Sequence, residues 1–200
     1  HVFGVCIEDH ADLSAPIEFS FGPQGLQFAH HDHWLNVLFN RLRVEEDIGI
    51  ICIPMAAYLP FEVYPNGEVY CDAEALYSFF LAHCREMNNR FLLLDSPKGL
   101  HDDLLVRWVE QFRRRNQQTA SYGALYYPWL CDRDKSYPPS GSIAGIFVRV
   151  ERDHPPIGIE WPPANVLVHG ATHMEIEFEW DEASLFSDNQ INPIIVQNGR

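Results

Sequence analysis

The sequence lacks the features of a disulfide scaffold, a membrane-spanning protein and a nucleic-acid-binding protein. Its five cysteines are an odd number at irregular spacing with no CxxC pair, so we expect reduced, mostly buried thiols made in a cytosol. No apolar run approaches about 18 residues and no signal peptide is present, which predicts no direct membrane insertion. Basic residues are scarce, 14 against 28 acidic ones, and the formal charge of −14 would repel a phosphate backbone or an anionic membrane.

The length and apolar content favour one sizeable core. The chain has 200 residues, 46% of them hydrophobic, which suffices for a single domain with a short appendage. It begins at His1 and ends on "QNGR", directly after the strand-like "NPIIV", so we expect a piece of a longer protein. We predict a core domain over residues 47–200, truncated at its C-terminal end. Residues 1–46 are expected to pack on that core as a segment whose placement the sequence does not define.

Strand-like and helix-like patterns alternate along the core. Short apolar runs predict buried strands at 48–53, 91–95 and 121–127. Helical spacing predicts helices at 72–90 and 100–116. Strand, helix, strand, helix, strand with short connections indicates an α/β fold, doubly wound, with a mostly parallel sheet and helices on both faces.

The two predicted helices carry further signals. Asp72 is expected to cap the first helix, with Glu74 at its positive end. In that helix, helical spacing links Ala75, Phe79, Ala82 and Glu86. The second helix is expected to bury Leu104, Leu105, Trp108, Val109 and Phe112 and to carry Arg113, Arg114 and Arg115 in its last turn.

The C-terminal part predicts one more helix and an antiparallel edge strand. Ser140, behind Pro138 and Pro139, is a candidate N-cap for a helix over 141–150. The inner positions of that helix are Ile143, Ile146, Phe147 and Val150. The strict alternation of "HMEIEFEW" over 173–180 predicts a half-exposed antiparallel strand. Trp129 and Trp161, each next to proline, are expected to be at least half buried.

One cluster in the N-terminal segment has residue types suited to a metal ion. It consists of His30, His31, Asp32 and His33. Neighbours on a helix point about 100° apart, and only His31 and His33 could share a strand face. We therefore favour a polar turn that caps a helix over 34–43, and predict no metal site. A metal-dependent enzyme that uses the cluster is the alternative interpretation.

No nucleophile occurs in a context that supports catalysis. "PPSGS" (138–142) resembles the serine turn of α/β hydrolases, but Pro138 replaces the usual glycine and a loop precedes it. Asp95 stands at the carboxyl end of a predicted parallel strand, where such sheets bind ligands, and Lys98 could meet an anion; we expect Asp95 to turn the chain. We predict no catalytic and no cofactor-binding residues. An α/β hydrolase or a generic oligomeric binding module remains open at this point.

Five blocks, in their order and spacing, resemble the conserved blocks of contractile tail sheath proteins, which occur in phages with contractile tails and in related bacterial injection machines. The blocks are "SYGALYYPWL" (121–130), "PPSGSIAG" (138–145), "VRVERDH" (148–154), "WPPANVLVHG" (161–170) and "INPIIVQNGR" (191–200). "ICIPM" and "LLLDSP" fit the earlier strands of the family. Pro162 departs from the pattern, since the family tends to carry a basic residue there, and the acidic residue that follows the family's arginine corresponds to either Glu151 or Asp153.

The resemblance implies a structural subunit and not an enzyme. Such a subunit polymerises helically around an inner tube and contracts to drive the tube through a target envelope. Its implied partners are other copies of the subunit, the inner tube protein, and baseplate and terminator components, with no nucleic acid and no cofactor. It implies assembly in the bacterial cytoplasm as part of a phage tail or a phage-tail-like particle. Because extended terminal arms link subunits in this family by strand addition, we expect the 200-residue chain alone to be a monomer.

Overall fold

The computed structural model describes residues 20–22, 25–27, 31–153, 166–178 and 180–195. The chain divides into two units, residues 1–49 and 50–200. In the first unit, β1 (Ser20–Gly22) pairs antiparallel with β2 (Gly25–Gln27), and α1 spans His31–Val44. The expected helix start at residue 34 is therefore wrong. The helix already includes Asp32, and an acidic residue is favourable in a first turn.

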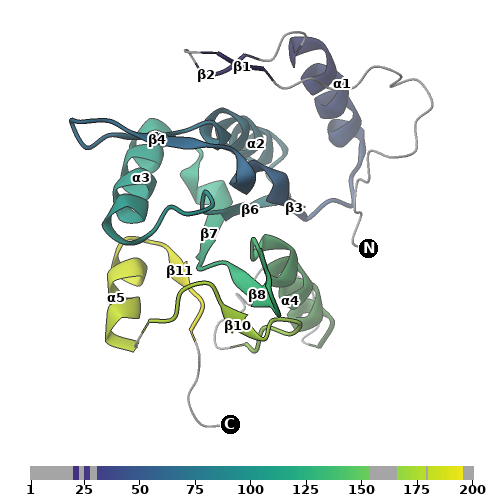
Figure 1. The fold of residues 1–200 in the computed structure, drawn as a ribbon. Helices are drawn as coiled ribbons and strands as arrows, with labels where there is room; N and C mark the ends of the chain where they lie inside the picture. The colour runs from purple at the N-terminus through teal and green to yellow at the C-terminus, as the bar shows by residue number, and fades with distance from the viewer. Residues whose placement is uncertain (1–19, 23–24, 28–30, 154–165, 179, 196–200) are drawn as a thin grey trace. The chain divides into compact units, whose positions relative to one another are not determined.

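A four-stranded parallel sheet forms the centre of the second unit (Figure 1). Its strands are β3 (Ile50–Cys52), β6 (Phe91–Asp95), β7 (Gly123–Tyr127) and β11 (Asn192–Pro193). The order is β11-β7-β6-β3, and each neighbouring pair is parallel. Leu92 and Leu93 of β6 are fully buried, as expected for a strand that is covered on both faces.

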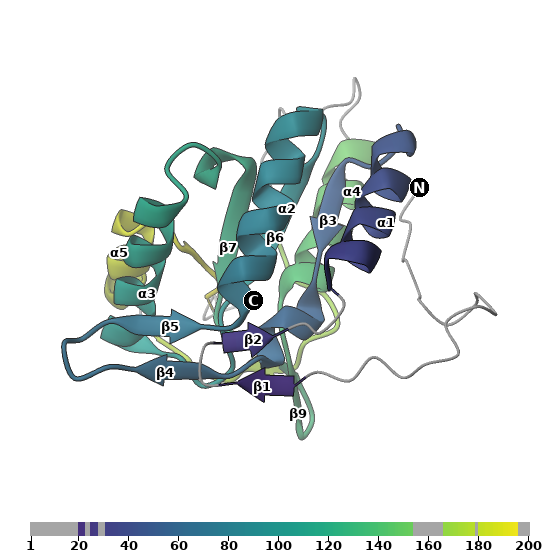
Figure 2. The same cartoon turned by 90° about the horizontal axis from the view of Figure 1, so that it is seen from above.

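Helices cover both faces of this sheet, so the predicted α/β class is confirmed. Along the chain, α2 (Ala73–Met87) lies between β3 and β6, and α3 (Asp102–Arg115) lies between β6 and β7. The chain passes from β3 to β6 and from β6 to β7, that is, in the same direction across the sheet. Connections between parallel strands are right-handed, so α2 and α3 lie on the same face. The opposite face carries α4 (Ser140–Asp153), which packs on β3 and β6, and α5 (Trp180–Asp188), which packs on β11 (Figures 1 and 2).

The packing on the two faces accounts for two features of the sequence. A Cβ atom at Gly123 would lie 2.7 Å from a Leu94 methyl group, 2.8 Å from a Leu81 methyl group and 3.0 Å from the Leu92 carbonyl oxygen, so glycine at the first residue of β7 lets these groups pack closely. On the other face, Ile143 and Ile146 of α4 are buried, as predicted. Their burial contributes about 1.5–3 kcal/mol each.

The expected inner face of α3 is only partly right, and the residues that helical spacing links in α2 lie mostly outside its buried side. In α2, Ala75, Ala82 and Glu86 are exposed. The buried residues of α2 are Ala73, Glu74, Tyr77, Phe80, Leu81, His83 and Cys84. In α3 the predicted set is confirmed except for Leu104, which is 36% exposed. In α2 apolar residues occur around most of the helix, so helical spacing alone does not identify the stripe that faces the sheet.

Antiparallel pairing occurs in separate, smaller sheets. β8 (Leu130–Asp132) lies between β9 (Lys135–Tyr137) and β10 (His173–Met174). An antiparallel edge strand is therefore present, but it includes only the first two residues of the predicted segment 173–180. Residues 175–178 are not strand, and the Phe178 ring packs on Tyr127 and Phe186, with centroid distances of 6.1 and 5.1 Å.

A second antiparallel pair, β4 (Phe61–Val63) with β5 (Val69–Cys71), was not anticipated from the sequence. It follows the 3₁₀ turn η2 (Pro54–Tyr58). Its connection contains Gly67 with φ of 83°, a conformation that favours glycine. The Asn66–Gly67 pair between alternating residues is a hairpin signal.

The four described cysteines, Cys52, Cys71, Cys84 and Cys131, are free thiols, and all except Cys52 are buried. Within the described part of the chain, no helix combines the length and apolar character needed to cross a bilayer.

Candidate functional site

The carboxyl end of β6 brings together three buried polar residues. Asp95, Ser96 and Ser140 are each at most 1% exposed. Asp95 Oδ1 accepts a hydrogen bond of 2.8 Å from the backbone N–H of Ser140. The carboxylate thus satisfies one of the free N–H groups at the start of α4 and ties this helix to the sheet.

One expectation for these residues is wrong and the other is incomplete. Ser140 is not the N-cap, because it is already the first residue of α4, and the N–H of Ile143 donates to the carbonyl of Pro139. Asp95 does not simply turn the chain. Its carboxylate, which comes from β6, accepts the hydrogen bond that caps the first turn of α4.

The backbone around Asp95 is held from the opposite side as well. The Tyr77 hydroxyl donates to the Asp95 carbonyl at 3.1 Å. The indole N–H of Trp129 donates to the Ser96 carbonyl at 2.9 Å. These bonds fix the strand end between α2, β7 and α4, and they leave it inaccessible to a substrate.

The titration of this cluster does not suit nucleophilic chemistry. Burial raises the pKa of Asp95 to about 6, while the hydrogen bond from the Ser140 N–H acts in the lowering direction. Among the described residues, no donor reaches Asp95 Oδ2 with hydrogen-bond geometry. Burial, followed by the charge of Asp95, raises the pKa of Cys52 to about 12. A thiol with that pKa is protonated near neutral pH and is a poor nucleophile.

Lys98 lies where an anion could have been expected, but its ammonium group faces aromatic rings. Its Nζ atom lies 5.5 Å from the centroid of Trp129 and 5.7 Å from that of Tyr58, a cation–π arrangement. Trp129 is 2% exposed, so its predicted burial is confirmed. Trp161 lies outside the described residues.

The structure does not form the strand that the metal interpretation required. The backbone of residues 31–33 is helical, so His31 and His33 do not lie on a common strand face. His30 lies outside the described residues. In the described ranges, no group of three or more His, Cys, Asp or Glu residues is arranged to hold a metal ion.

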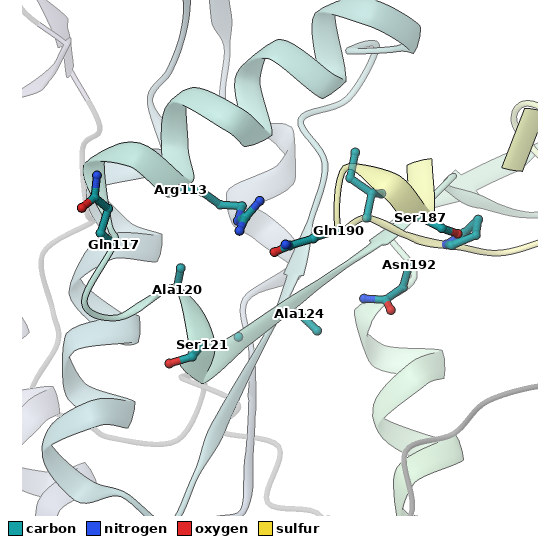
Figure 3. Close-up of a pocket in the computed structure, with 11 residues that line it drawn as sticks. Arg113, Gln117, Ala120, Ser121, Ala124, Ser187, Gln190 and Asn192 are labelled. Atoms are coloured by element: carbon teal, nitrogen blue, oxygen red, sulfur yellow. The ribbon is translucent and has the colours of Figure 1, made fainter. Parts of the chain in front are cut away.

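A pocket with a volume of about 500 Å³ lies at the amino end of β7, far along the chain from the predicted candidates (Figure 3). Its polar lining residues are Arg113, Gln117, Ser121, Ser187, Gln190 and Asn192. Gly123 and Ala124 of β7 and Pro193 of β11 also line it. The Asn192 side chain donates to the Leu125 carbonyl at 3.0 Å and so fixes one wall. The sequence contained no local signal for this pocket, because its residues come from two distant stretches of the chain, 113–124 and 187–193.

Comparisons with known proteins identify the fold. No family model and no curated protein matches the chain. Among solved structures, it is similar to the helical sheath of the anti-feeding prophage in its contracted state, with a TM-score of 0.57 and 19% identity. That match covers 86% of this chain, which spans 42% of the sheath chain's length. A chain of the anti-feeding prophage baseplate also matches, with a TM-score of 0.47, 23% identity, 62% of this chain covered and 31% of the other.

At these identities the similarity establishes the fold. The resemblance to contractile tail sheath proteins, which the sequence blocks predicted, is therefore confirmed at the level of the fold by the contracted sheath structure.

Proposed function

We propose that this chain is part of a structural subunit of a contractile tail sheath. In this proposal the subunit polymerises helically around an inner tube, and contraction drives the tube through a target envelope. The observation that carries the proposal is the similarity of 86% of the chain to a contracted sheath. The order of the five sequence blocks from residue 121 to residue 200 supports it independently.

The closed carboxyl edge of the sheet supports a structural role rather than an enzymatic one. Open α/β sheets usually bind ligands at this edge. Here Asp95, Ser96 and Ser140 are buried and connect the sheet to α4. Polar groups that could serve a reaction instead hold two layers of the fold together, as a subunit under mechanical load requires.

The proposed partners are other copies of the subunit, the inner tube protein, and baseplate and terminator components. Contacts between copies would be heterologous, and such contacts propagate as an open helix rather than closing. The net charge of −14 argues against nucleic acid as a partner. We place assembly in the bacterial cytoplasm, as part of a phage tail or a phage-tail-like particle.

Light scattering on two proteins tests this proposal. We expect residues 1–200 alone to be monomeric, because copies with a net charge of −14 repel each other. The complete gene product, mixed with an inner tube protein, should form rings or tubes. A complete gene product that stays monomeric with the tube protein at every salt concentration would contradict the proposal.

A further inference from the structure

The pocket at the amino end of β7 has an unusual charge for this protein. The chain has twice as many acidic as basic residues. Among the described residues that line the pocket there is nevertheless one arginine and no aspartate or glutamate. A site with this lining attracts a single negative charge rather than a cation.

The arginine of the pocket differs from its two neighbours in the last turn of α3. Arg114 pairs with Glu110, and Arg115 pairs with Glu74 at 2.7 Å. Arg113 forms no side-chain ion pair or hydrogen bond with any described residue. Figure 3 shows its guanidinium group directed from α3 into the pocket, where its donors are available to a ligand.

The pocket also contains a side chain in a strained backbone conformation. Gln190 has φ of 61° at the end of α5. Its N–H donates to the Ser187 carbonyl and the N–H of Ile191 donates to the Phe186 carbonyl, both at 2.9 Å. This is the bonding pattern of a helix end at which glycine is usual, because a side chain is unfavourable there. Figure 3 shows the Gln190 amide directed toward the same space as the Arg113 guanidinium.

We propose that this pocket binds a carboxylate group, with the Arg113 guanidinium as its anchor and the Gln190 amide as a second donor. The planar guanidinium can donate two parallel hydrogen bonds to the two oxygens of a carboxylate. The amide of Gln117 and the hydroxyl of Ser121 line the same pocket and can complete the ligand's hydrogen bonds. One arginine matches the single charge of a carboxylate better than the double charge of a phosphate.

The end of α3 opposes an anion only weakly. Carbonyl groups at a helix C-terminus carry partial negative charge. Here the Phe112 carbonyl already accepts hydrogen bonds from the backbone and side-chain nitrogens of Asn116, both at 3.0 Å. The proposal goes beyond the sheath function and does not depend on it, because it rests on pocket residues alone.

Two sources can supply the carboxylate, a protein side chain or a free small molecule. Three probes separate them in a titration of the 200-residue chain monitored by ¹H–¹⁵N NMR. The probes are the peptide acetyl-Gly-Glu-Gly-amide, its neutral match acetyl-Gly-Gln-Gly-amide, and acetate. Shifts in the Arg113 Nε and Gln190 amide signals with the glutamate peptide but not the glutamine peptide support a protein carboxylate. The same shifts with acetate alone support a free small carboxylate. No shift with either carboxylate probe up to about 10 mM overturns the proposal.

Matched variants test the anchor. Arg113→Gln should raise the dissociation constant of the carboxylate probe by about tenfold or more. Arg114→Gln removes the same charge from the same turn and should leave affinity within about twofold of the original chain. Equal losses in the two variants would show nonspecific attraction of anions and would overturn the proposal.

Gln190→Gly separates a binding role from a structural one. Glycine relieves the unfavourable conformation, so this variant should have a higher Tm. It should also bind the carboxylate probe several-fold more weakly, since the amide donor is lost. A stabilised variant with unchanged affinity would remove Gln190 from the proposed site.

Discussion

Replacement of Asp95 by asparagine gives a direct test of the buried capping carboxylate. The new amide side chain would retain an acceptor oxygen for the Ser140 N–H but would carry no charge. In the folded chain the pKa of Asp95 is raised to about 6 by burial, against a usual value of 3.8. The folded state therefore binds more protons than the unfolded state between these two values. The free energy of unfolding of the original chain should then fall as the pH rises through this window.

The size of the effect follows from the two pKa values. One pKa unit is equivalent to about 1.4 kcal/mol, so the full destabilising contribution of the Asp95 charge is about 3 kcal/mol well above pH 6. Part of this contribution is already present at about pH 4.5, where most unfolded chains are ionised at this residue. Between about pH 4.5 and about pH 7.5, Asp95→Asn should therefore become more stable relative to the original chain by about 2 kcal/mol.

Urea denaturation at the two pH values measures this change. The comparison uses the pH dependence of the stability difference, so any constant effect of the new amide group cancels. Asp132→Asn is the matched control, because Asp132 is exposed at the end of β8. Its stability difference should change by less than about 0.5 kcal/mol. A similarly flat result for Asp95→Asn would refute the assignment of Asp95 as a buried carboxylate with one capping bond.

Three further predictions concern packing, a buried ion pair and metal binding. Trp129→Ala should cost about 3–5 kcal/mol in chemical denaturation, because the ring is almost fully buried; a loss below about 1 kcal/mol would contradict its place in the core. Glu74 is buried and accepts hydrogen bonds from the Trp108 indole at 3.0 Å and from Arg115, so Glu74→Gln should cost about 1–3 kcal/mol. Glu110→Gln, which breaks an exposed pair, should cost less than about 1 kcal/mol. Equal losses of stability in Glu74→Gln and Glu110→Gln would show that burial of Glu74 does not account for its contribution. Elemental analysis of the purified chain should find no stoichiometric zinc; one zinc per chain that disappears when His31 and His33 are replaced would revive the metal interpretation.

The elements that could be predicted from sequence are those whose burial follows a local pattern. β6 was predicted to the residue because its apolar run has no polar interruption and both faces are covered. The inner face of α3 was predicted because Trp108 and Phe112 recur at helical spacing. The buried face of α2 was not, because apolar residues occur around most of that helix. In β10 the alternation of residues 173–180 continues after hydrogen-bonded pairing has ended, so the predicted strand was too long.

The sites depend on contacts between distant segments, which no local pattern contains. Asp95 and Ser140 are 45 residues apart, and each could be interpreted only as an isolated turn or cap residue. The pocket combines the end of α3 with the loop between α5 and β11. The left-handed conformation of Gln190 had no signal in the sequence, since neither glycine nor asparagine occupies that position. The family resemblance, by contrast, was visible because it rests on the order of blocks and not on contacts.

The central claim is most directly tested by cryo-electron microscopy of the complete gene product mixed with an inner tube protein. The account predicts a helical polymer around a tube, in which the parallel sheet of residues 50–200 recurs once per subunit at the position of the corresponding fold in the contracted sheath. The same preparation should contain a longer and a shorter state of the polymer. A chain that never joins a helical polymer around the tube, or that forms only closed discrete oligomers without it, would contradict the assignment.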